Sequence, residues 1–327
     1  MSAVRDESQA GQDPMWWVVS AHYGAEAAAY QGDSNLAAAG LAATAPDAEK
    51  FGTMWSGNSH GVRAVAALAA GDVAAADQSS RTAWELLAEV PIHQRMYGYV
   101  LAEVALVRGD LVTAHGWAEE AVSSTIGWHR VLALTTRARV QIAEREPELA
   151  EQDAYDALGL AADLGTHLGI PDILECLAAS AGAGGSHARS ARLFGAAEGI
   201  SRQMGSVRFK VHDAEHATWL RTARDALGDK DFDVALAEGW ALSTLEAIAS
   251  AQRGKGERRR PTMGWSSLTP AERDVVRLLC NGLANKEIAK RLLVSPRTDQ
   301  THLTHIYTKL DLTSRVQLVQ EASRHQD

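Results

Sequence analysis

Polar side chains of a few kinds gather on one face of the segment 295–310, near the C-terminal end of the chain. At 100° per residue, this face of a helix would carry guanidinium, amide, hydroxyl and imidazole groups and no carboxylate: Arg297, Gln300, Thr301, Thr304, His305 and Thr308. Such groups form hydrogen bonds with the edges of nucleic-acid bases and with phosphates. The pattern predicts a helix whose polar face contacts DNA.

The other side of the same helix is apolar, with one exception. Leu303, Ile306 and Leu310 fall on one stripe, which we expect to be buried. Asp299 also falls on this stripe, and an unpaired buried carboxylate is unfavourable. Its place in the first turns of the helix offsets part of that cost through the helix dipole. We therefore hypothesise that the domain folds but binds DNA weakly or with altered preference.

Three further helices are expected to position this one. The residues Thr269-Pro-Ala-Glu272 form a capping box ahead of an apolar face. A second helix is predicted over 285–292, and Ser295, followed by proline, caps the third. Ser314-Arg-Val-Gln317 caps the fourth. A short helix, a tight turn and a helix of this kind match helix-turn-helix geometry.

The segment 268–325 resembles the LuxR-type (GerE-like) DNA-binding domain over its full length. The matching residues, in chain order, are Leu268-Thr-Pro-x-Glu272, Gly282, Asn285-Lys-Glu-Ile-Ala289, Leu292, Ser295-Pro-Arg-Thr298, Thr301-His302, Ile306, Lys309-Leu310 and Ser314-Arg315. Asp299 replaces the apolar residue, usually Val, of that family, and Ala284 replaces a capping Ser. The stretch 190–246 also resembles the region that precedes this domain in large ATP-binding LuxR-type activators. No phosphate-binding loop of the G-x-x-x-x-G-K-[ST] type occurs in this sequence.

The resemblance implies a role for individual residues. Those expected to face base edges in the major groove are Gln300, Thr301 and Thr304, with His305 on the same polar face. Those expected to contact phosphates are Lys286, Arg297, Thr298 and Lys309, helped by Ser295 at the helix N-terminus. Val316 and Val319 of the fourth helix would form a dimer contact. The implied partner is double-stranded DNA, bound by a homodimer.

Upstream, a Gly-Asp pair recurs between alanine-rich apolar segments. It occurs at 32–33, 71–72 and 109–110, spacings of 39 and 38 residues, and further turns are expected at 146–148 and 184–186. Gly suits the end of one helix and Asp or Ser caps the start of the next. This period predicts four helix–turn–helix units, closed by a less regular helical stretch at 188–251. The expected fold is all-α: an α-solenoid of tetratricopeptide-like hairpins followed by a four-helix LuxR-type domain.

Composition adds the domain limits. We expect a disordered lead-in at 1–14, a helical-repeat domain at 15–251, a linker at 252–266 and the DNA-binding domain at 267–327. Residues 252–327 hold 14 basic and 8 acidic residues, a net charge of +6, whereas the remainder holds 18 and 33, a net charge of −15. A basic end on an acidic body indicates that only this end approaches a polyanion.

Other function classes find little support in the sequence. The two cysteines lie far apart in apolar patterns, and neither a signal peptide nor a membrane span is evident, so a reducing cytoplasm is expected. No local pattern indicates a metal site, a cofactor or a catalytic set, so an enzyme is not expected. A protein or small-molecule effector is expected on the repeats. The alternative is an interaction or dimerisation protein whose helix-turn-helix no longer binds DNA.

Three features allow two interpretations. The arginines at 258–260 could contact DNA, although a solvated linker is favoured. The glycines at 182–186 could bind phosphate, although a repeat turn is favoured. Six tryptophans could line a ligand groove, although core packing between repeats is favoured: Trp16, Trp17, Trp55, Trp84, Trp117 and Trp128.

Overall fold

A computed structural model describes residues 14–258 and, beyond them, residues 275–276, 278–280, 283, 285–291, 306–310, 312 and 314–323. The chain divides into two compact units, residues 1–251 and 252–327, which are described separately. All the regular elements of the described residues are helices, which confirms the predicted all-α fold class. The predicted lead-in lies outside the described residues, except that Pro14 begins the first described helix.

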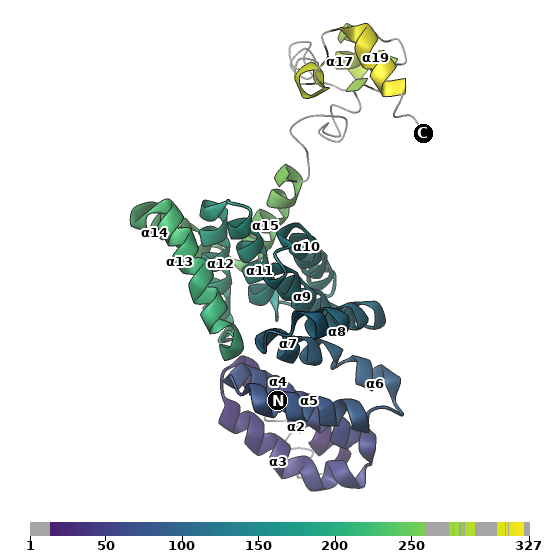
Figure 1. Cartoon of the computed structure of the whole chain (residues 1–327), viewed down its shortest axis with the longest axis vertical. Helices are drawn as coiled ribbons and strands as arrows, with labels where there is room; N and C mark the ends of the chain where they lie inside the picture. The colour runs from purple at the N-terminus through teal and green to yellow at the C-terminus, as the bar shows by residue number, and fades with distance from the viewer. Residues whose placement is uncertain are drawn as a thin grey trace. The chain divides into compact units, whose positions relative to one another are not determined.

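The first unit is a stack of helical hairpins (Figure 1). The paired helices are α2 (Pro14–Tyr30) with α3 (Ser34–Lys50), α4 (Thr53–Ala70) with α5 (Val73–Leu86), α7 (Gly98–Val107) with α8 (Leu111–Ser124), α9 (Gly127–Ala143) with α10 (Pro147–Asp163), and α11 (Ile170–Ala183) with α12 (His187–Met204). The short helix α6 (Pro91–Arg95) precedes the third hairpin. The first helix of each hairpin contacts the first helix of the next, so α2, α4, α7, α9 and α11 form one layer.

This arrangement confirms the predicted solenoid and corrects its extent. The described residues hold five hairpins rather than four units, because α12, expected in the irregular stretch, pairs closely with α11. Alanines fill the contacts between helices: Ala64, Ala138 and Ala157 are fully buried. Their small side chains allow the helix axes to approach closely, as the alanine-rich sequence predicts.

Aspartates cap the second helix of the first three hairpins, as predicted. The Asp33 carboxylate accepts a hydrogen bond from the Leu36 N–H at 2.9 Å, and Asp72 and Asp110 form the equivalent bonds at 3.0 and 3.1 Å. The glycine before each aspartate has a φ of 76°, 84° or 78°. Each aspartate N–H also donates to the carbonyl five residues earlier, which is the Schellman ending of a helix.

The last two hairpins turn differently. Arg145 adopts the left-handed conformation, with a φ of 66°, and is alone among the described non-glycine residues in doing so. Pro147 then starts α10, as expected of a breaker that suits a first helical position. Ser186 precedes α12 but its side chain forms no capping hydrogen bond, so the prediction that Ser caps this helix was wrong. Its N–H instead closes the turn by donating to the Ala181 carbonyl at 2.8 Å.

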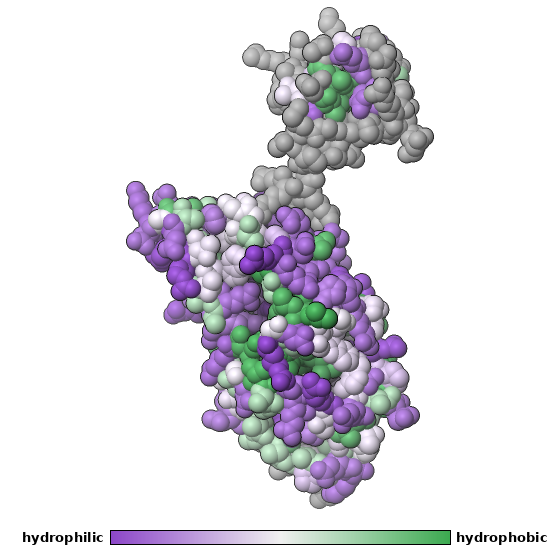
Figure 2. Space-filling view, in the orientation of Figure 1, coloured by the Kyte–Doolittle hydropathy of each residue, from purple (hydrophilic) through white to green (hydrophobic). Residues whose placement is uncertain are grey.

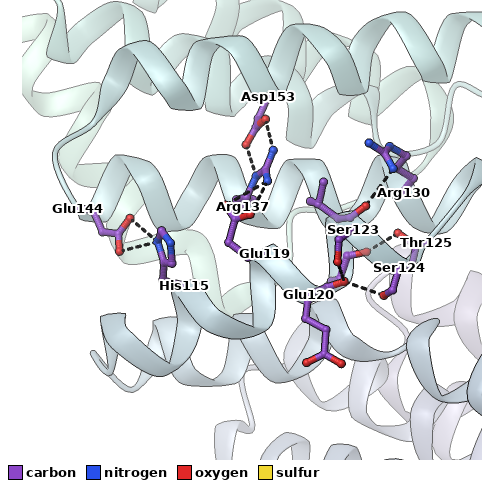
Figure 3. A network of polar contacts seen from close by, with 12 residues as sticks. His115, Glu119, Glu120, Ser123, Ser124, Thr125, Arg130, Arg137, Glu144 and Asp153 are labelled. Carbon is purple, nitrogen blue, oxygen red and sulfur yellow. Dashed lines mark hydrogen bonds and ion pairs between the residues drawn. The ribbon is translucent and has the colours of Figure 1, made fainter.

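A charged network joins the third and fourth hairpins (Figure 3). Arg137 of α9 donates from Nε and Nη2 to the two carboxylate oxygens of Asp153 in α10, at 2.6 and 2.8 Å. Its Nη1 donates to Glu119 of α8 at 3.1 Å. Bidentate pairing of this kind fixes the relative orientation of the groups as well as adding energy. One side chain thus links three consecutive helices.

Beyond the hairpins, α13 (Asp213–Leu227), α14 (Asp229–Trp240) and α15 (Thr244–Arg258) complete the unit. Helices α12 and α14 meet backbone to backbone, because a Cβ at Gly195 would lie 2.1 Å from the Leu236 carbonyl oxygen. A Cβ at Gly239 would lie 1.8 Å from the Arg192 carbonyl oxygen. A methyl group at either position would force the two helices apart.

The first residues of the predicted linker, 252–258, are helical, because α15 continues to Arg258. Its first half packs into the core of the first unit through Ala247, Ile248 and Ala251. The Tyr155 hydroxyl also donates to the Ala251 carbonyl at 3.0 Å. Once begun, the helix continues through residues that lack an apolar period, since each added residue gains a backbone hydrogen bond.

Across the described residues, none of the helices combines the length and the hydropathy that a membrane crossing requires.

Candidate DNA-binding domain and the groove of the repeat domain

The second unit has a small apolar core built from residues far apart in its sequence. Val275, Leu279, Ile288, Ile306 and Leu318 are all at most 1% exposed. The second and fourth predicted helices are present as α17 (Asn285–Arg291) and α19 (Arg315–Ser323). Residues 306–310, the end of the predicted third helix, are helical. Four segments of the predicted domain therefore share one core.

The fourth helix begins as predicted. The Gln317 N–H donates to the Ser314 hydroxyl at 3.3 Å, and the Ser314 N–H donates to the Gln317 side-chain oxygen at 3.2 Å. These reciprocal bonds form the capping box that the sequence Ser-Arg-Val-Gln indicates.

Arg315 has a structural role that sequence reasoning missed. Its Nη2 donates to the Leu283 carbonyl at 2.6 Å, and its Nη1 donates to Asn285 Oδ1 at 3.1 Å. Arg315 therefore ties the start of α17 to the start of α19 and fixes the short helix ahead of the predicted recognition helix. The sequence signal for this role was that both Asn285 and Arg315 belong to the matched motif. Their pairing could not be predicted from it, because the two residues are 30 positions apart.

The third helix follows its predicted division where it is described. Ile306 is fully buried and Leu310 packs against the same core, whereas Thr308 on the opposite face is exposed. Leu303 and Asp299 lie outside the described residues. The apolar stripe is thus confirmed at the C-terminal end of this helix.

Most of the predicted DNA-contacting residues lie outside the described residues: Ser295, Arg297, Thr298, Gln300, Thr301, Thr304 and His305. Lys286 lies within α17, and Lys309 lies half-buried in the helical residues 306–310. The proposed dimer residues Val316 and Val319 lie within α19. Their contacts with DNA and with a second chain stay predictions.

The layer of first helices in the repeat domain carries a groove that the sequence did not predict. On the face of the unit seen in Figure 2, hydrophobic residues gather in a hollow over the region of α7 and α9. Side chains of α2, α4, α7, α9 and α11 line the groove, including Tyr30, Val65, Tyr99 and Thr135. Phe209 and His212, from a segment remote in sequence, also lie in it.

The chain's own segment 207–212 occupies this part of the groove. The Val207 N–H donates to the Tyr30 carbonyl at 2.8 Å, and the rings of Phe209 and Tyr30 lie 5.1 Å apart. Arg208 donates from Nε to Glu175 of α11 at 2.7 Å. We call residues 207–212 the groove segment. It bridges α2 and α11, at the two ends of the layer.

His212 of the groove segment joins a largely buried charge cluster with Glu103, Arg139 and Asp172. Arg139 donates to Glu103 Oε1 at 2.9 Å and to Asp172 Oδ1 at 2.5 Å. Glu103 Oε1 also accepts from Thr136 at 2.7 Å, whereas its Oε2 has no hydrogen-bond partner among the described residues and lies 3.6 Å from His212 Nε2. We call these four residues the charge cluster.

Burial and charge act against each other in this cluster. Burial acts to raise the pKa of Glu103, but Arg139, His212 and the Thr136 hydrogen bond outweigh it, so this pKa lies below its usual value. Burial, reinforced by Arg139, lowers the pKa of His212 to about 4, although Glu103 acts in the opposite direction. At neutral pH the cluster therefore holds a carboxylate and a neutral imidazole.

The features with two interpretations are partly decided. The glycine-rich turn is a repeat turn, since Gly182 lies in the last turn of α11 and Gly185, just after this helix, has the left-handed φ of 76°. Trp84 and Trp117 pack edge to face between hairpins with ring centroids 4.7 Å apart, whereas Trp16 is 58% exposed. Trp55 and Trp128 line a cavity. The tryptophans therefore serve different purposes.

Comparison with known proteins identifies the C-terminal segment. Residues 266–322 match the family described as "Bacterial regulatory proteins, luxR family". The Escherichia coli protein named "Nitrate/nitrite response regulator protein NarL" is 44% identical over 73 residues, which cover 22% of this chain and 32% of that protein.

Longer relatives match nearly the whole chain. The Mycobacterium tuberculosis protein named "Putative HTH-type transcriptional regulator Rv0890c" is 50% identical over 321 residues, covering 98% of this chain and 36% of that protein. A Mycobacterium bovis protein with the corresponding name, Mb0914c, matches to the same extent. This chain thus spans about a third of the length of these relatives. No solved structure matches it. Residues 266–322 of this chain are a DNA-binding-type domain of the bacterial LuxR family of regulatory proteins.

Proposed function

We propose that this protein is a bacterial transcriptional regulator that binds promoter DNA through residues 267–327 and receives a signal on its helical repeats in the cytoplasm. The observation that carries the proposal is the third helix, where Ile306 is buried in the core and Thr308 of the polar face is exposed, inside the LuxR-type segment. The net charge of +6 over residues 252–327 favours approach to DNA. The names of the long relatives also support regulation of transcription.

The polar face divides into residues that would determine sequence preference and residues that would add affinity. Gln300, Thr301 and Thr304 are expected to contact base edges, and Arg297 to contact a phosphate. Replacing Gln300 by Ala should weaken binding to a preferred site by about 1–3 kcal/mol and relax the preference at one base pair. Arg297→Ala should weaken binding to all sequences and reduce the salt dependence.

The test uses the full chain. A preferred site is selected from random-sequence DNA, and binding by wild type, Gln300→Ala and Arg297→Ala is then measured over a range of salt. Arg95→Ala is the matched control, because it removes an exposed arginine from α6 of the repeat domain. Equal loss of affinity in Arg95→Ala and Arg297→Ala would contradict the proposed face. Absence of retention on DNA at low salt would contradict DNA binding altogether.

We propose in addition that α19 forms the homodimer contact. Val316→Glu and Val319→Glu should convert a dimer to a monomer in sedimentation, because burying a charge in an apolar contact is unfavourable. A dimer would place two recognition helices on half-sites about one DNA turn apart. A wild-type chain that sediments as a monomer on and off DNA would contradict this contact.

Asp299 favours a second candidate function, an interaction or dimerisation protein that does not bind DNA. The carboxylate falls at the start of the apolar stripe and close to where DNA phosphates would lie, so it opposes both packing and binding. Asp299→Val should therefore raise DNA affinity in the same binding assay. Equal DNA affinities of wild type and Asp299→Val would contradict the idea that Asp299 weakens DNA binding.

A further inference from the structure

The groove continues beyond the groove segment into a second cavity. The cavity has a volume of about 280 Å³ and shares Val65 and Tyr99 with the part of the groove that the groove segment fills. Its remaining walls come from α2, α4, α6, the start of α7 and α9, within the same layer of helices. We call it the aromatic cavity. It lies outside the LuxR-type domain and has no role in the function proposed for that domain.

Five aromatic side chains from different helices line the aromatic cavity: Tyr23, Trp55, Tyr97, Tyr99 and Trp128. Aromatic rings present a partial negative charge on their faces, which attracts cations. Such a set of rings in a helical repeat is more than packing requires, because the cavity they enclose is not filled by other side chains. The walls suit a ligand with an apolar or aromatic body.

Two of these rings are held in position by glycines. A Cβ at Gly61 would lie 2.4 Å from the Tyr97 ring, and a Cβ at Gly169 would lie 2.8 Å from the Trp128 ring. The Tyr97 hydroxyl also lies 3.3 Å from Asn58 Oδ1, to which it donates. The rings therefore pack directly on helix backbone, and this part of the wall is organised before any ligand arrives.

Glu26 is the one acidic residue that lines the cavity, and no Lys or Arg of the described residues lines it. Within the described part of the chain, its carboxylate forms no hydrogen bond and no ion pair, and the residue is partly exposed. Burial raises the pKa of Glu26. A partly desolvated carboxylate without a partner is unfavourable, so a bound cation would gain a strong partner there.

Two of the three lining histidines, His22 and His129, do not supply that positive charge. His22 Nε2 lies 2.7 Å from the Ser59 hydroxyl, and burial lowers the pKa of His22 to about 4. Burial and the neighbouring His93 lower the pKa of His129. Both imidazoles are therefore neutral at pH 7 and offer hydrogen bonds without repelling a cation. Among the described residues, no group of His, Cys, Asp and Glu is arranged to hold a metal ion.

We propose that the aromatic cavity binds a small organic ammonium compound, whose charge is balanced by Glu26 and whose apolar part lies among the aromatic rings. A metal ion lacks a ligand set, and an anion would be repelled by Glu26. The volume admits a small molecule, at the lower end of the range of ligand pockets. This ligand would be the effector of the regulator proposed above, so its role as a signal rests on that function; its binding does not.

The test compares compounds of one shape and different charge: 2-phenylethylammonium, 2-phenylethanol and phenylacetate, with phenyltrimethylammonium as a quaternary cation. Binding to the full chain is measured without DNA, by calorimetry and by the change in intrinsic tryptophan fluorescence, to which Trp55 and Trp128 contribute. We expect the two cations to bind at least about tenfold more tightly than the alcohol, a difference of about 1.4 kcal/mol, and phenylacetate to bind least. A negative result here would contradict ligand binding without contradicting DNA binding, and a protein that does not bind DNA could still bind these cations.

Glu26→Gln is the decisive variant, because glutamine keeps the shape of the side chain and removes only its charge. It should weaken both cations by about tenfold or more while leaving the alcohol unchanged. Glu49→Gln is the matched control, since Glu49 is exposed on α3 and lies outside the cavity. Trp55→Leu should weaken the cations more than the alcohol.

Three outcomes would overturn the proposal. The first is equal binding of 2-phenylethylammonium and 2-phenylethanol to wild type. The second is unchanged cation affinity in Glu26→Gln. The third is the absence of saturable binding of either cation at millimolar concentration.

Discussion

Two carboxylates in different parts of one groove differ in their hydrogen-bond partners and in the direction of their pKa shift. In the part filled by the groove segment, Glu103 is bonded to Arg139 and Thr136, and its pKa lies below the usual value. In the aromatic cavity, the partly buried Glu26 has no such partner among the described residues, and its pKa lies above the usual value. The carboxylate with partners therefore lies where the groove segment fills the groove, and the carboxylate without a partner lies in the aromatic cavity.

Arg139→Met should cause the largest change in unfolding free energy, because it removes the cation that pairs with Glu103. Arg139 is 14% exposed and bonds both Glu103 and Asp172, so the substitution leaves two carboxylates without their cation. Breaking a buried ion pair in this way costs about 3–5 kcal/mol of unfolding free energy. Urea denaturation followed by circular dichroism measures it. Arg81→Met, which breaks an exposed pair with Asp77, should cost less than about 1 kcal/mol; equal losses would contradict the importance of the cluster.

Phe209→Ala should come next, because it removes the ring that packs against Tyr30 in the groove. Phe209 is partly buried, so we expect a loss of about 2–4 kcal/mol, at or below the range for a core phenylalanine. Hydrogen exchange should show faster exchange at the Val207 N–H, which donates to Tyr30. Phe51→Ala, on an exposed ring after α3, serves as control. Unchanged exchange at Val207 would mean that Phe209 does not hold the segment.

His212 should make the protein less stable in acid. The native protein keeps this imidazole neutral down to about pH 4, whereas the unfolded chain binds a proton below about pH 6.5. Its contribution is therefore present above pH 6.5 and is lost as the pH falls toward 4. His212→Asn should make the fall in unfolding free energy over this window smaller by roughly 1–3 kcal/mol. Urea titrations at several pH values measure the slope, and an unchanged slope would show that other groups cause it.

Glu26→Gln should have the smallest effect and the opposite sign. At pH 7 the native carboxylate is partly desolvated without a partner, so its removal should raise the unfolding free energy by at most about 1 kcal/mol. Because the native pKa of Glu26 is raised, this gain should shrink as the pH falls through that pKa and the carboxyl group becomes protonated. Glu49→Gln, on the exposed face of α3, should change the stability by less than about 0.5 kcal/mol. A destabilised Glu26→Gln would indicate a partner for Glu26.

Features that depend on neighbouring residues could be predicted from the sequence. The caps at Asp33, Asp72 and Asp110, the capping box at Ser314 and the buried Ile306 all follow from residue types at fixed short spacings. The periodic turns likewise indicated the hairpins. These interactions join residues within one or two turns of helix, so no knowledge of the tertiary structure is needed.

Features that depend on distant pairs could not be predicted. Arg139 and Glu103 are 36 residues apart, and Val207 reaches back to Tyr30. Glu103 and Glu26 gave one signal, since each is the single carboxylate of a largely apolar helix. Trp55 and Trp128 gave another, since tryptophans at these positions could line a ligand groove. The continuation of α15 to Arg258 was also missed, because a helix anchored by tertiary packing extends into residues with little pattern of their own.

The groove segment also determines how a peptide could use this layer of helices. An extended peptide entering between Tyr30 and Glu175 meets Val207, Arg208 and Phe209 already in place. Those residues belong to the same chain, so they compete at the effective concentration of a tethered ligand, which is millimolar for short flexible connections. A peptide must therefore bind more tightly than the tethered groove segment to displace it, whereas a small molecule in the aromatic cavity does not compete with the groove segment.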